Sequence, residues 1–292
     1  MHFEPSKSSL APMPFIVGVG RSGTTLLRMM LDAHPEMAIP PELNWLEATM
    51  QDFDATEPDL QALADKIAKT QSWPDLDMSR SDLDHLLQAS RPPLAQSFLR
   101  QLYRRYANRF DKPRSGDKTP KNLLRMPWLQ QVLPEARFIH IIRDGRDVAL
   151  SWKSVWIGER ADISQLATSW KNQIEQGRRD SAQLTHYMEI RYEALSADPE
   201  KVLRQVCEFI ELEVHPAQAS FHNMSARRLE ELKDMQHHRP IAAQERQDMF
   251  ALTTRPPTTE RIDKWKSEMT DQEIAIFHEK AGGLLHELGY EI

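Results

Sequence analysis

The stretch that decides the fold is PFIVGVGRSGTTLLRMML, residues 14–31. Residues 15–19 form a short run of β-branched and aromatic side chains, which is typical of a strand buried in a parallel sheet. Gly18 lies within this run, and Gly20 and Gly23 follow it. Apolar residues at helical spacing come after the glycines. The stretch therefore predicts a buried strand, a glycine-rich loop and a helix in direct succession.

A loop of this kind favours anions, because the N–H groups in the first turn of a helix lack partners and carry partial positive charge. Residues 18–25 match the phosphate-loop pattern G-x-x-x-x-G-K-[ST] except that Thr24 replaces the lysine. That lysine reaches the β- and γ-phosphates of a nucleoside triphosphate, so its loss predicts an anion of different shape or length. Arg21 supplies a cation within the loop. A plain strand–turn–helix junction remains the alternative.

A second apolar run, RFIHII at residues 137–142, predicts another inner strand. Arg143 stands at its C-terminal end, where open α/β sheets bind ligands and where a triphosphate hydrolase usually has a magnesium-holding aspartate. Arg143 and Ser151, two helical turns later, predict a fork for a phosphate monoester, because guanidinium pairs bidentately with phosphate oxygens. His140, inside the run, is interpreted as a structural residue of the core.

Three further residues are candidates for a site. Glu42 lies on the proline-stiffened loop IPPEL, where it is either a general base or a solvated loop acid. Lys118 lies in the turn-rich sequence SGDKTP, which predicts that it is presented at a strand end. Tyr192 closes a third predicted strand, residues 188–192, and either contacts a nucleotide or packs structurally.

Composition limits the class of protein. The chain has 292 residues, a net charge of −6 and a pI near 6.0, which disfavour a general nucleic-acid binder and indicate that anion attraction is local. Cys207 is the single cysteine, so no intrachain disulfide forms and a reducing compartment fits. Residues 1–13 lack a secretory apolar run, and no stretch reaches membrane-spanning length. We expect a cytoplasmic protein without a membrane span.

The organisation of the chain predicts one domain. No linker divides residues 1–292, so we expect a single α/β domain with a P-loop-like, three-layer fold around a central parallel sheet. Apolar residues at helical spacing from about 56 to 110 predict a helical insertion that can cover an acceptor pocket. Residues 221–259 are polar, and no pattern in their sequence indicates what this segment does. Within them, His237 and His238 lack the spacing of a helical metal pair, so no metal site is predicted.

Three motifs together resemble the sulfotransferases that use 3′-phosphoadenosine 5′-phosphosulfate, especially the branch that contains the tyrosyl-protein sulfotransferases. GVGRSGTTLLRMMLDAHPEM resembles the 5′-phosphosulfate loop of that family, and IIRDGRDVALSW is similar to its 3′-phosphate motif. RYEAL resembles the segment whose tyrosine contacts the nucleotide, and RIDKW is a weaker C-terminal match. Each motif alone is modest, but their order along the chain is specific.

The resemblance implies that the donor is 3′-phosphoadenosine 5′-phosphosulfate. Arg143 and Ser151 would hold its 3′-phosphate, and Tyr192 and Lys264 would contact the nucleotide. The 5′-phosphosulfate would lie against Gly20, Arg21, Ser22, Gly23, Thr24 and Thr25.

The resemblance also implies catalytic roles. Glu42 falls where the tyrosyl-protein enzymes keep their base, and Lys118 falls where they keep a lysine on the phosphosulfate bridge. Arg21 would join Lys118 in stabilising the departing phosphate. One departure concerns the 3′-phosphate. Val155 stands where the family has a further cation one turn after the serine, so either Lys153 contacts the phosphate there or no cation does.

The reaction implied is in-line transfer of a sulfuryl group to an acceptor hydroxyl without a metal. A phenol, with a pKa of about 10, is easier for a carboxylate to activate than an alkyl alcohol, so we expect a phenolic or tyrosyl acceptor on a small molecule or peptide. The expected partners include no nucleic acid, and the sequence leaves the oligomeric state open, with a homodimer as one alternative. The alternatives are a P-loop kinase of a small molecule and a non-catalytic nucleotide-binding module.

Overall fold

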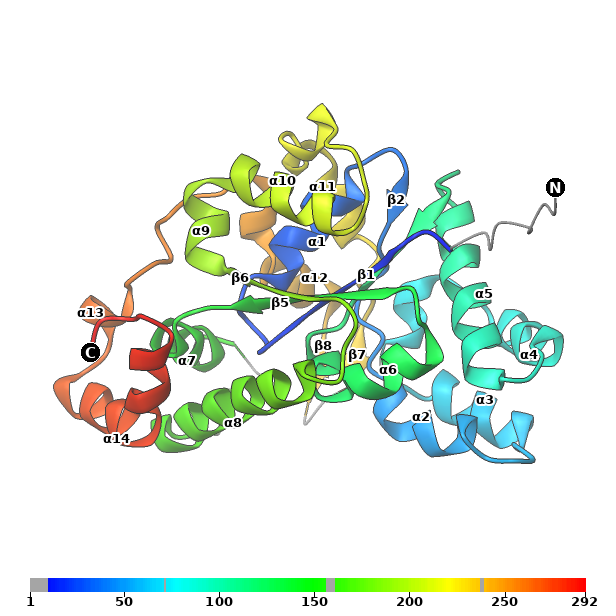
Figure 1. The fold of residues 1–292 in the computed structure, drawn as a ribbon, viewed down its shortest axis with the longest axis horizontal. Coiled ribbons are helices and arrows are strands. Elements are labelled where there is room, and N and C mark those ends of the chain that lie inside the picture. The colour runs from blue at the N-terminus through cyan, green and yellow to red at the C-terminus, as the bar shows by residue number, and fades with distance from the viewer. Residues whose placement is uncertain (1–9, 71, 156–160, 237–238) are drawn as a thin grey trace, which may run out of the picture.

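The protein has a central sheet of four parallel strands in the order β4-β1-β5-β6 (Figure 1). The structure is a computed structural model that describes residues 10–70, 72–155, 161–236 and 239–292. The predictions about the His237–His238 pair and, up to residue 9, about the segment 1–13 lie outside these ranges. The strands are β1 (Met13–Gly18), β4 (Asp117–Lys118), β5 (Ala136–Ile142) and β6 (Tyr187–Arg191). The predicted α/β fold with a central parallel sheet is confirmed.

The two faces of the sheet bury alternate residues. Phe15 and Phe138 lie on one face and contact each other with ring centroids 5.6 Å apart, whereas Ile16 and Ile139 belong to the core on the other face. Strand side chains alternate in this way because the pleat has a period of two residues. One prediction is wrong by a residue: Tyr192 is not the end of the third strand but the first residue of helix α9.

Helices cover both faces, which makes three layers (Figure 1). The layer above the sheet in that view contains α1 (Thr24–Asp32), α9 (Tyr192–Ala197), α10 (Pro199–Phe209) and α11 (His222–Leu229). The layer below contains α6 (Met126–Val132), α7 (Gly145–Lys153), α8 (Ile163–Ser181) and α14 (Asp271–Glu287). Cys207 is fully buried in α10.

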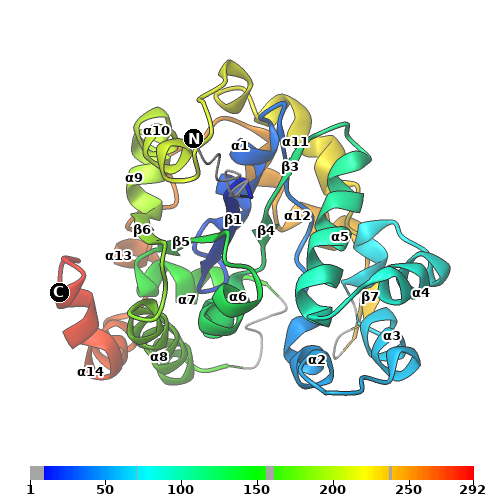
Figure 2. The ribbon, with the colours of Figure 1, turned by 45° about the vertical axis from the view of Figure 1, so that its right-hand side comes forward.

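The predicted helical insertion is present and stands to one side of the sheet (Figure 2). It contains α2 (Leu46–Phe53), α3 (Leu60–Ala68), the 3₁₀-helix η1 (Trp73–Leu76), α4 (Arg80–Ala89) and α5 (Leu94–Asn108). The helical region begins at residue 46 rather than about 56, because Phe53 of α2 packs on Phe98 of α5 with ring centroids 5.3 Å apart. Trp73 is buried in this core.

The described part of the polar segment 221–259 is folded, and its helix α11 packs on α1. After α11 it contains β7 (Met235–Gln236), β8 (Pro240–Ile241), α12 (Ala243–Asp248) and the 3₁₀-helix η4 (Ala251–Thr254). The remaining elements are β2 (Met37–Ala38), β3 (Arg114–Ser115), α13 (Trp265–Glu268) and the 3₁₀-helices η2 (Pro120–Arg125) and η3 (Pro216–Gln218). Over the described ranges, no helix is both long enough and apolar enough to span a bilayer.

Candidate active site

A cavity of about 1070 Å³ lies at the carboxyl end of the central sheet. This is the edge at which parallel α/β sheets bind ligands, and the volume accommodates a nucleotide together with a second molecule. Its walls come from the glycine-rich loop, the insertion, α7 and the segment 229–264. Every predicted site residue except Ser22 lines it.

The cavity wall is basic although the chain carries a net negative charge. Among the described lining residues, ten are cationic, namely Arg21, Arg28, Lys69, Lys118, Lys121, Arg143, Arg246, Arg255, Arg261 and Lys264. The described lining residues also include four carboxylates, Glu42, Asp147, Asp248 and Glu268. Positive charge concentrated in a concave site raises the local concentration of anionic ligands, so the prediction of local anion attraction is consistent with this wall.

The glycine-rich loop connects β1 to α1. Gly23 precedes α1 with φ of +92°, and a Cβ built on it would lie 2.4 Å from Cδ2 of Tyr192. Only glycine meets both conditions without strain. Ser22 is buried beneath the loop, and its Oγ has no hydrogen-bond partner among the described residues. The loop therefore holds a buried hydroxyl and the free N–H groups of α1 at one point.

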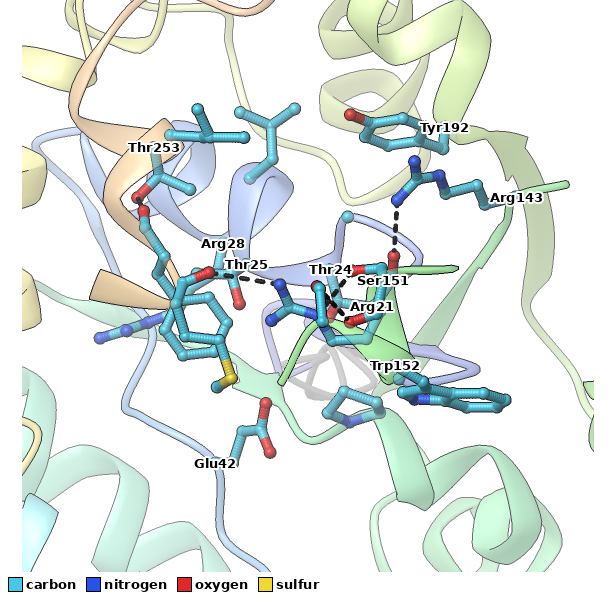
Figure 3. A pocket seen from close by; sticks show the side chains of 18 of the residues that line it. Arg21, Thr24, Thr25, Arg28, Glu42, Arg143, Ser151, Trp152, Tyr192 and Thr253 are labelled. Carbon is cyan, nitrogen blue, oxygen red and sulfur yellow. Dashed lines mark hydrogen bonds between the residues drawn. The ribbon is translucent and has the colours of Figure 1, made fainter. Parts of the chain in front are cut away.

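The side chain of Arg21 lies in the cavity beside Ser151 (Figure 3). Its Nε donates to Oγ of Ser151 at 3.0 Å, and its Nη2 donates to the backbone oxygen of Met249 at 3.3 Å. Burial, with repulsion from Arg143 as the next cause, lowers the pKa of Arg21 to about 10. The guanidinium thus stays charged at neutral pH although other cations lie close to it. A bound anion would offset the repulsion between these cations.

Arg143 lies at the second predicted anion position. Its guanidinium is 4.4 Å from the ring centroid of Tyr192 and donates to the backbone oxygens of Arg21 at 3.1 Å and Arg261 at 2.6 Å (Figure 3). Within the described part of the chain, Nε of Arg143 has no partner although it is buried. The structure therefore brings Arg143, Ser151 and Tyr192 together, although they come from three separate elements.

The residues near the 3′-phosphate motif differ in their exposure to the cavity. Lys153 forms an ion pair with Glu273 of α14, and neither it nor Val155 is among the described lining residues. Lys264 lines the cavity, but its Nζ is 2.6 Å from Oε1 of Glu268. Lys153 is therefore a poor candidate for the cation that contacts the 3′-phosphate in other members of the family.

Glu42 and Lys118 form an ion pair at the other end of the cavity. Oε1 of Glu42 is 2.7 Å from Nζ of Lys118, and that Nζ also donates to Oγ1 of Thr25 at 3.3 Å. Burial disfavours the charged form of Glu42, but the charge and hydrogen bond of Lys118 and a hydrogen bond from Asn44 outweigh it, so its pKa lies below the ordinary value. Burial lowers the pKa of Lys118. The side chain of Lys118 is 3% exposed and that of Glu42 is 33% exposed, so the carboxylate is the partner within reach of a second ligand.

Sequence reasoning missed several lining residues, among them Arg28, Phe250 and Arg246. Arg28 lies one helical turn beyond Thr24, and that i, i+4 spacing was a signal that places both on one face of α1. Phe250 lies over the cations of both Arg21 and Lys118, with its ring centroid 5.5 and 5.6 Å away. Arg246 donates to the buried carboxylate of Asp75 at 2.8 and 2.5 Å. No sequence signal in the polar segment indicated the last two.

His140 is structural, as predicted. It is fully buried in β5, and its Nδ1 is 2.7 Å from the hydroxyl of Tyr187. Burial lowers the pKa of His140 to about 4, so the ring is neutral at physiological pH.

The family follows from a comparison with family models. Residues 12–216, well over half of the chain, match the model described as the sulfotransferase family. The chain belongs to the sulfotransferase family. It is therefore a transferase that moves sulfuryl groups, and the kinase and the non-catalytic module are disfavoured.

Curated relatives match nearly the whole chain. Nodulation protein NoeE of Sinorhizobium fredii is 25% identical, over 97% of this chain and 67% of that protein. Protein-tyrosine sulfotransferase A of Caenorhabditis elegans is 25% identical, over 96% and 68%, and the protein-tyrosine sulfotransferase of Drosophila melanogaster is 24% identical, over 96% and 52%. The chain thus spans from about half to two thirds of the length of these relatives.

Solved structures support the fold. The sulfotransferase domain from the Synechococcus PCC 7002 olefin synthase superposes with a TM-score of 0.59 at 21% identity, covering 99% of this chain and 98% of that one. The sulfotransferase domain from the curacin biosynthetic pathway superposes with a TM-score of 0.57 at 18% identity, covering 98% and 100%. The predicted P-loop-like architecture is that of this family.

Proposed function

We propose that the chain transfers the sulfuryl group of 3′-phosphoadenosine 5′-phosphosulfate to an acceptor hydroxyl. The observation that carries the proposal is the hydrogen bond from Arg143 to the backbone oxygen of Arg21, which puts a second anion position directly beside the phosphate-binding loop. The donor has phosphates at both ends of one ribose and needs two such positions. The unpartnered Oγ of Ser22 and Nε of Arg143, among the described residues, are polar atoms that its oxygens can satisfy.

The chemistry follows from the arrangement of charges. The acceptor oxygen attacks the sulfur, and the bond between sulfur and the bridging phosphate oxygen breaks. Glu42 accepts the hydroxyl proton, while Lys118 and Arg21 stabilise the negative charge on the departing adenosine 3′,5′-bisphosphate. The products are a sulfate ester and the bisphosphate. No step in this proposal uses a metal.

The low pKa of Glu42 supports a phenolic or tyrosyl acceptor. A carboxylate stabilised by Lys118 is a weak base, so it deprotonates a phenol, with a pKa of about 10, more readily than an alkyl alcohol. Two of the relatives described above are protein-tyrosine sulfotransferases, which is consistent with such an acceptor. A single-domain organisation, cytoplasmic location and a homodimer stay predictions, to be tested by limited proteolysis, fractionation and light scattering.

The donor is tested by calorimetry on the purified protein. Adenosine 3′,5′-bisphosphate should bind at least tenfold more tightly than ATP, and magnesium should not change that ratio. Equal affinities, or ATP binding that needs magnesium, would overturn the donor assignment and favour the kinase. Acceptors are then screened with labelled donor against phenols, tyrosyl peptides, sugars and lipids. Transfer to sugars or lipids with none to phenols or tyrosyl peptides would overturn the acceptor class.

A further inference from the structure

A buried hydrogen bond ties the chain segment of Glu42 to that of Lys118. The backbone N–H of Leu43 donates to Oγ1 of Thr119 at 2.9 Å. The peptide group that follows Glu42 is therefore bonded to the residue that follows Lys118, and both Leu43 and Thr119 are almost completely buried. The two segments are joined twice, once by the side chains of the ion pair and once through the backbone.

The direction of this bond is set by Asp117. The hydroxyl of Thr119 donates its one proton to Oδ2 of Asp117 at 3.1 Å, so a lone pair is left for the N–H of Leu43. Asp117 is fully buried and also accepts from the hydroxyl of Tyr103 at 3.0 Å and from Nδ2 of Asn122 at 2.9 Å. These donors come from α5 and η2, so the insertion and the sheet edge both hold the carboxylate in place.

The far side of the Glu42 loop has a second anchor. The backbone N–H of Asn44 donates to Oγ of Ser72, just before η1, at 3.1 Å. Asn44 directly follows Leu43, so the chain is held on both sides of the Leu43 peptide. With Pro41 fixing φ on the preceding side, the backbone around Glu42 has little freedom to turn its carboxylate away from Lys118.

We propose that Thr119 and Asp117 are positioning residues for sulfuryl transfer, which hold the Glu42 peptide so that its carboxylate stays between Lys118 and the acceptor. The inference rests on the proposed role of Glu42 as the base. Neither Thr119 nor Asp117 is among the described residues that line the cavity, so both act through Glu42. A misplacement of about 1 Å at a reacting group costs on the order of 100-fold in rate, which is why a catalytic base needs such support.

The test removes the hydroxyl and keeps the shape. Thr119→Val deletes the acceptor for Leu43 and the donor to Asp117, and Thr119→Ser restores both. The matched control is Thr49→Val, since Thr49 is also fully buried in the same region but its hydroxyl donates to the backbone oxygens of Trp45 and Leu46 at the start of its own helix. Thr119→Val should lower kcat at least tenfold with less than a twofold change in affinity for adenosine 3′,5′-bisphosphate. Thr119→Ser should recover kcat to within threefold of wild type, and Thr49→Val should leave it unchanged.

A purely structural role predicts a different pattern. It would weaken bisphosphate binding together with kcat, and unchanged kcat in Thr119→Val would also overturn the proposal. If Thr119→Val does not fold, Tyr103→Phe, which removes one donor from Asp117, replaces it and should lower kcat at least threefold at unchanged bisphosphate affinity; unchanged kcat would count against the inference. In a Glu42→Gln background, Thr119→Val should change the remaining kcat less than twofold.

A measurement without turnover separates this inference from the proposed function. The pKa of the Glu42 carboxyl, followed by carbon NMR, should rise by at least half a unit in Thr119→Val and stay unchanged in Thr49→Val. A pKa that does not move would overturn the positioning role. Full turnover in Glu42→Gln alone would instead remove the base from the proposed mechanism, whatever the titration shows.

Discussion

Nε of Arg21 donates to Oγ of Ser151 at 3.0 Å, which joins the glycine-rich loop to a helix 130 residues further along the chain. The same Arg21 accepts a hydrogen bond on its backbone oxygen from Arg143. One residue therefore links the two anion positions. Its side-chain partners are a neutral hydroxyl and a carbonyl, so its charge is available to a bound anion.

Arg143 should select for the 3′-phosphate. Arg143→Met should weaken binding of adenosine 3′,5′-bisphosphate about 10- to 100-fold, because a hydrogen bond to a charged group contributes roughly 1.5–3 kcal/mol. Adenosine 5′-phosphate, which lacks that phosphate, should change less than threefold. Both affinities are measured by calorimetry. Arg137→Met, at the opposite end of β5, is the matched control and should change neither; an equal loss for both nucleotides would mean that Arg143 acts only on the loop.

Glu42 should be needed for turnover and not for donor binding. Glu42→Gln should lower kcat by about 10²- to 10⁴-fold, the range for a general base, and leave bisphosphate affinity within twofold. Steady-state kinetics and calorimetry measure the two effects. Glu36→Gln, at an exposed acid just before β2, should behave as wild type. A variant with a glutamine at position 42 that turns over normally would require another base.

Lys118 should set the pH at which activity appears. Since Glu42 acts as a base, kcat/KM rises as the pH rises through its pKa, which lies below the ordinary 4.5 in the native protein. Lys118→Met removes the largest of the causes that oppose burial, so the pKa of Glu42 and with it the acid limb of the residual activity should move to higher pH. The pH profiles of the two proteins decide the matter: a limb that does not move would exclude Glu42 as the titrating base.

The same ion pair should make stability depend on pH. The folded pKa of Glu42 is depressed, so its stabilising contribution is present above the unfolded value and is lost as the pH falls through the folded value. Urea unfolding of wild type and Glu42→Gln between pH 3 and 7 measures the contribution. The difference in free energy of unfolding should shrink toward low pH, and a constant difference would contradict the linkage.

Gly23 should tolerate no side chain. Gly23→Ala should lower the free energy of unfolding by about 1–3 kcal/mol, because the residue has φ of +92° and its Cβ would meet the Tyr192 ring. Thermal unfolding measures it, and bisphosphate binding should fall as well. Gly283→Ala is the control: it lies in the interior of α14 with open space around it and should stabilise by about 0.5–1 kcal/mol. Equal effects at both positions would contradict the steric argument.

Local pattern predicted most of the scaffold. The strands at 15–19 and 137–142 were found because a buried parallel strand is a continuous apolar run. Arg143 and Ser151 were found together because both belong to one strand–turn–helix unit. The start of the insertion was missed, since α2 is held by a contact with α5 that no local signal shows.

The sequence by itself determined the loop, the order of the anion-binding motifs and the class of reaction, since each motif is a local pattern and their order can be read along the chain. The tertiary structure alone decided that Glu42 meets Lys118, that Thr119 holds the Glu42 peptide, and that Phe250 covers the two cations. These contacts join residues that lie 76 or more positions apart in the chain. Such pairs form only because the parallel sheet brings the carboxyl ends of its strands to one edge, and spacing along the chain carries no information about that meeting.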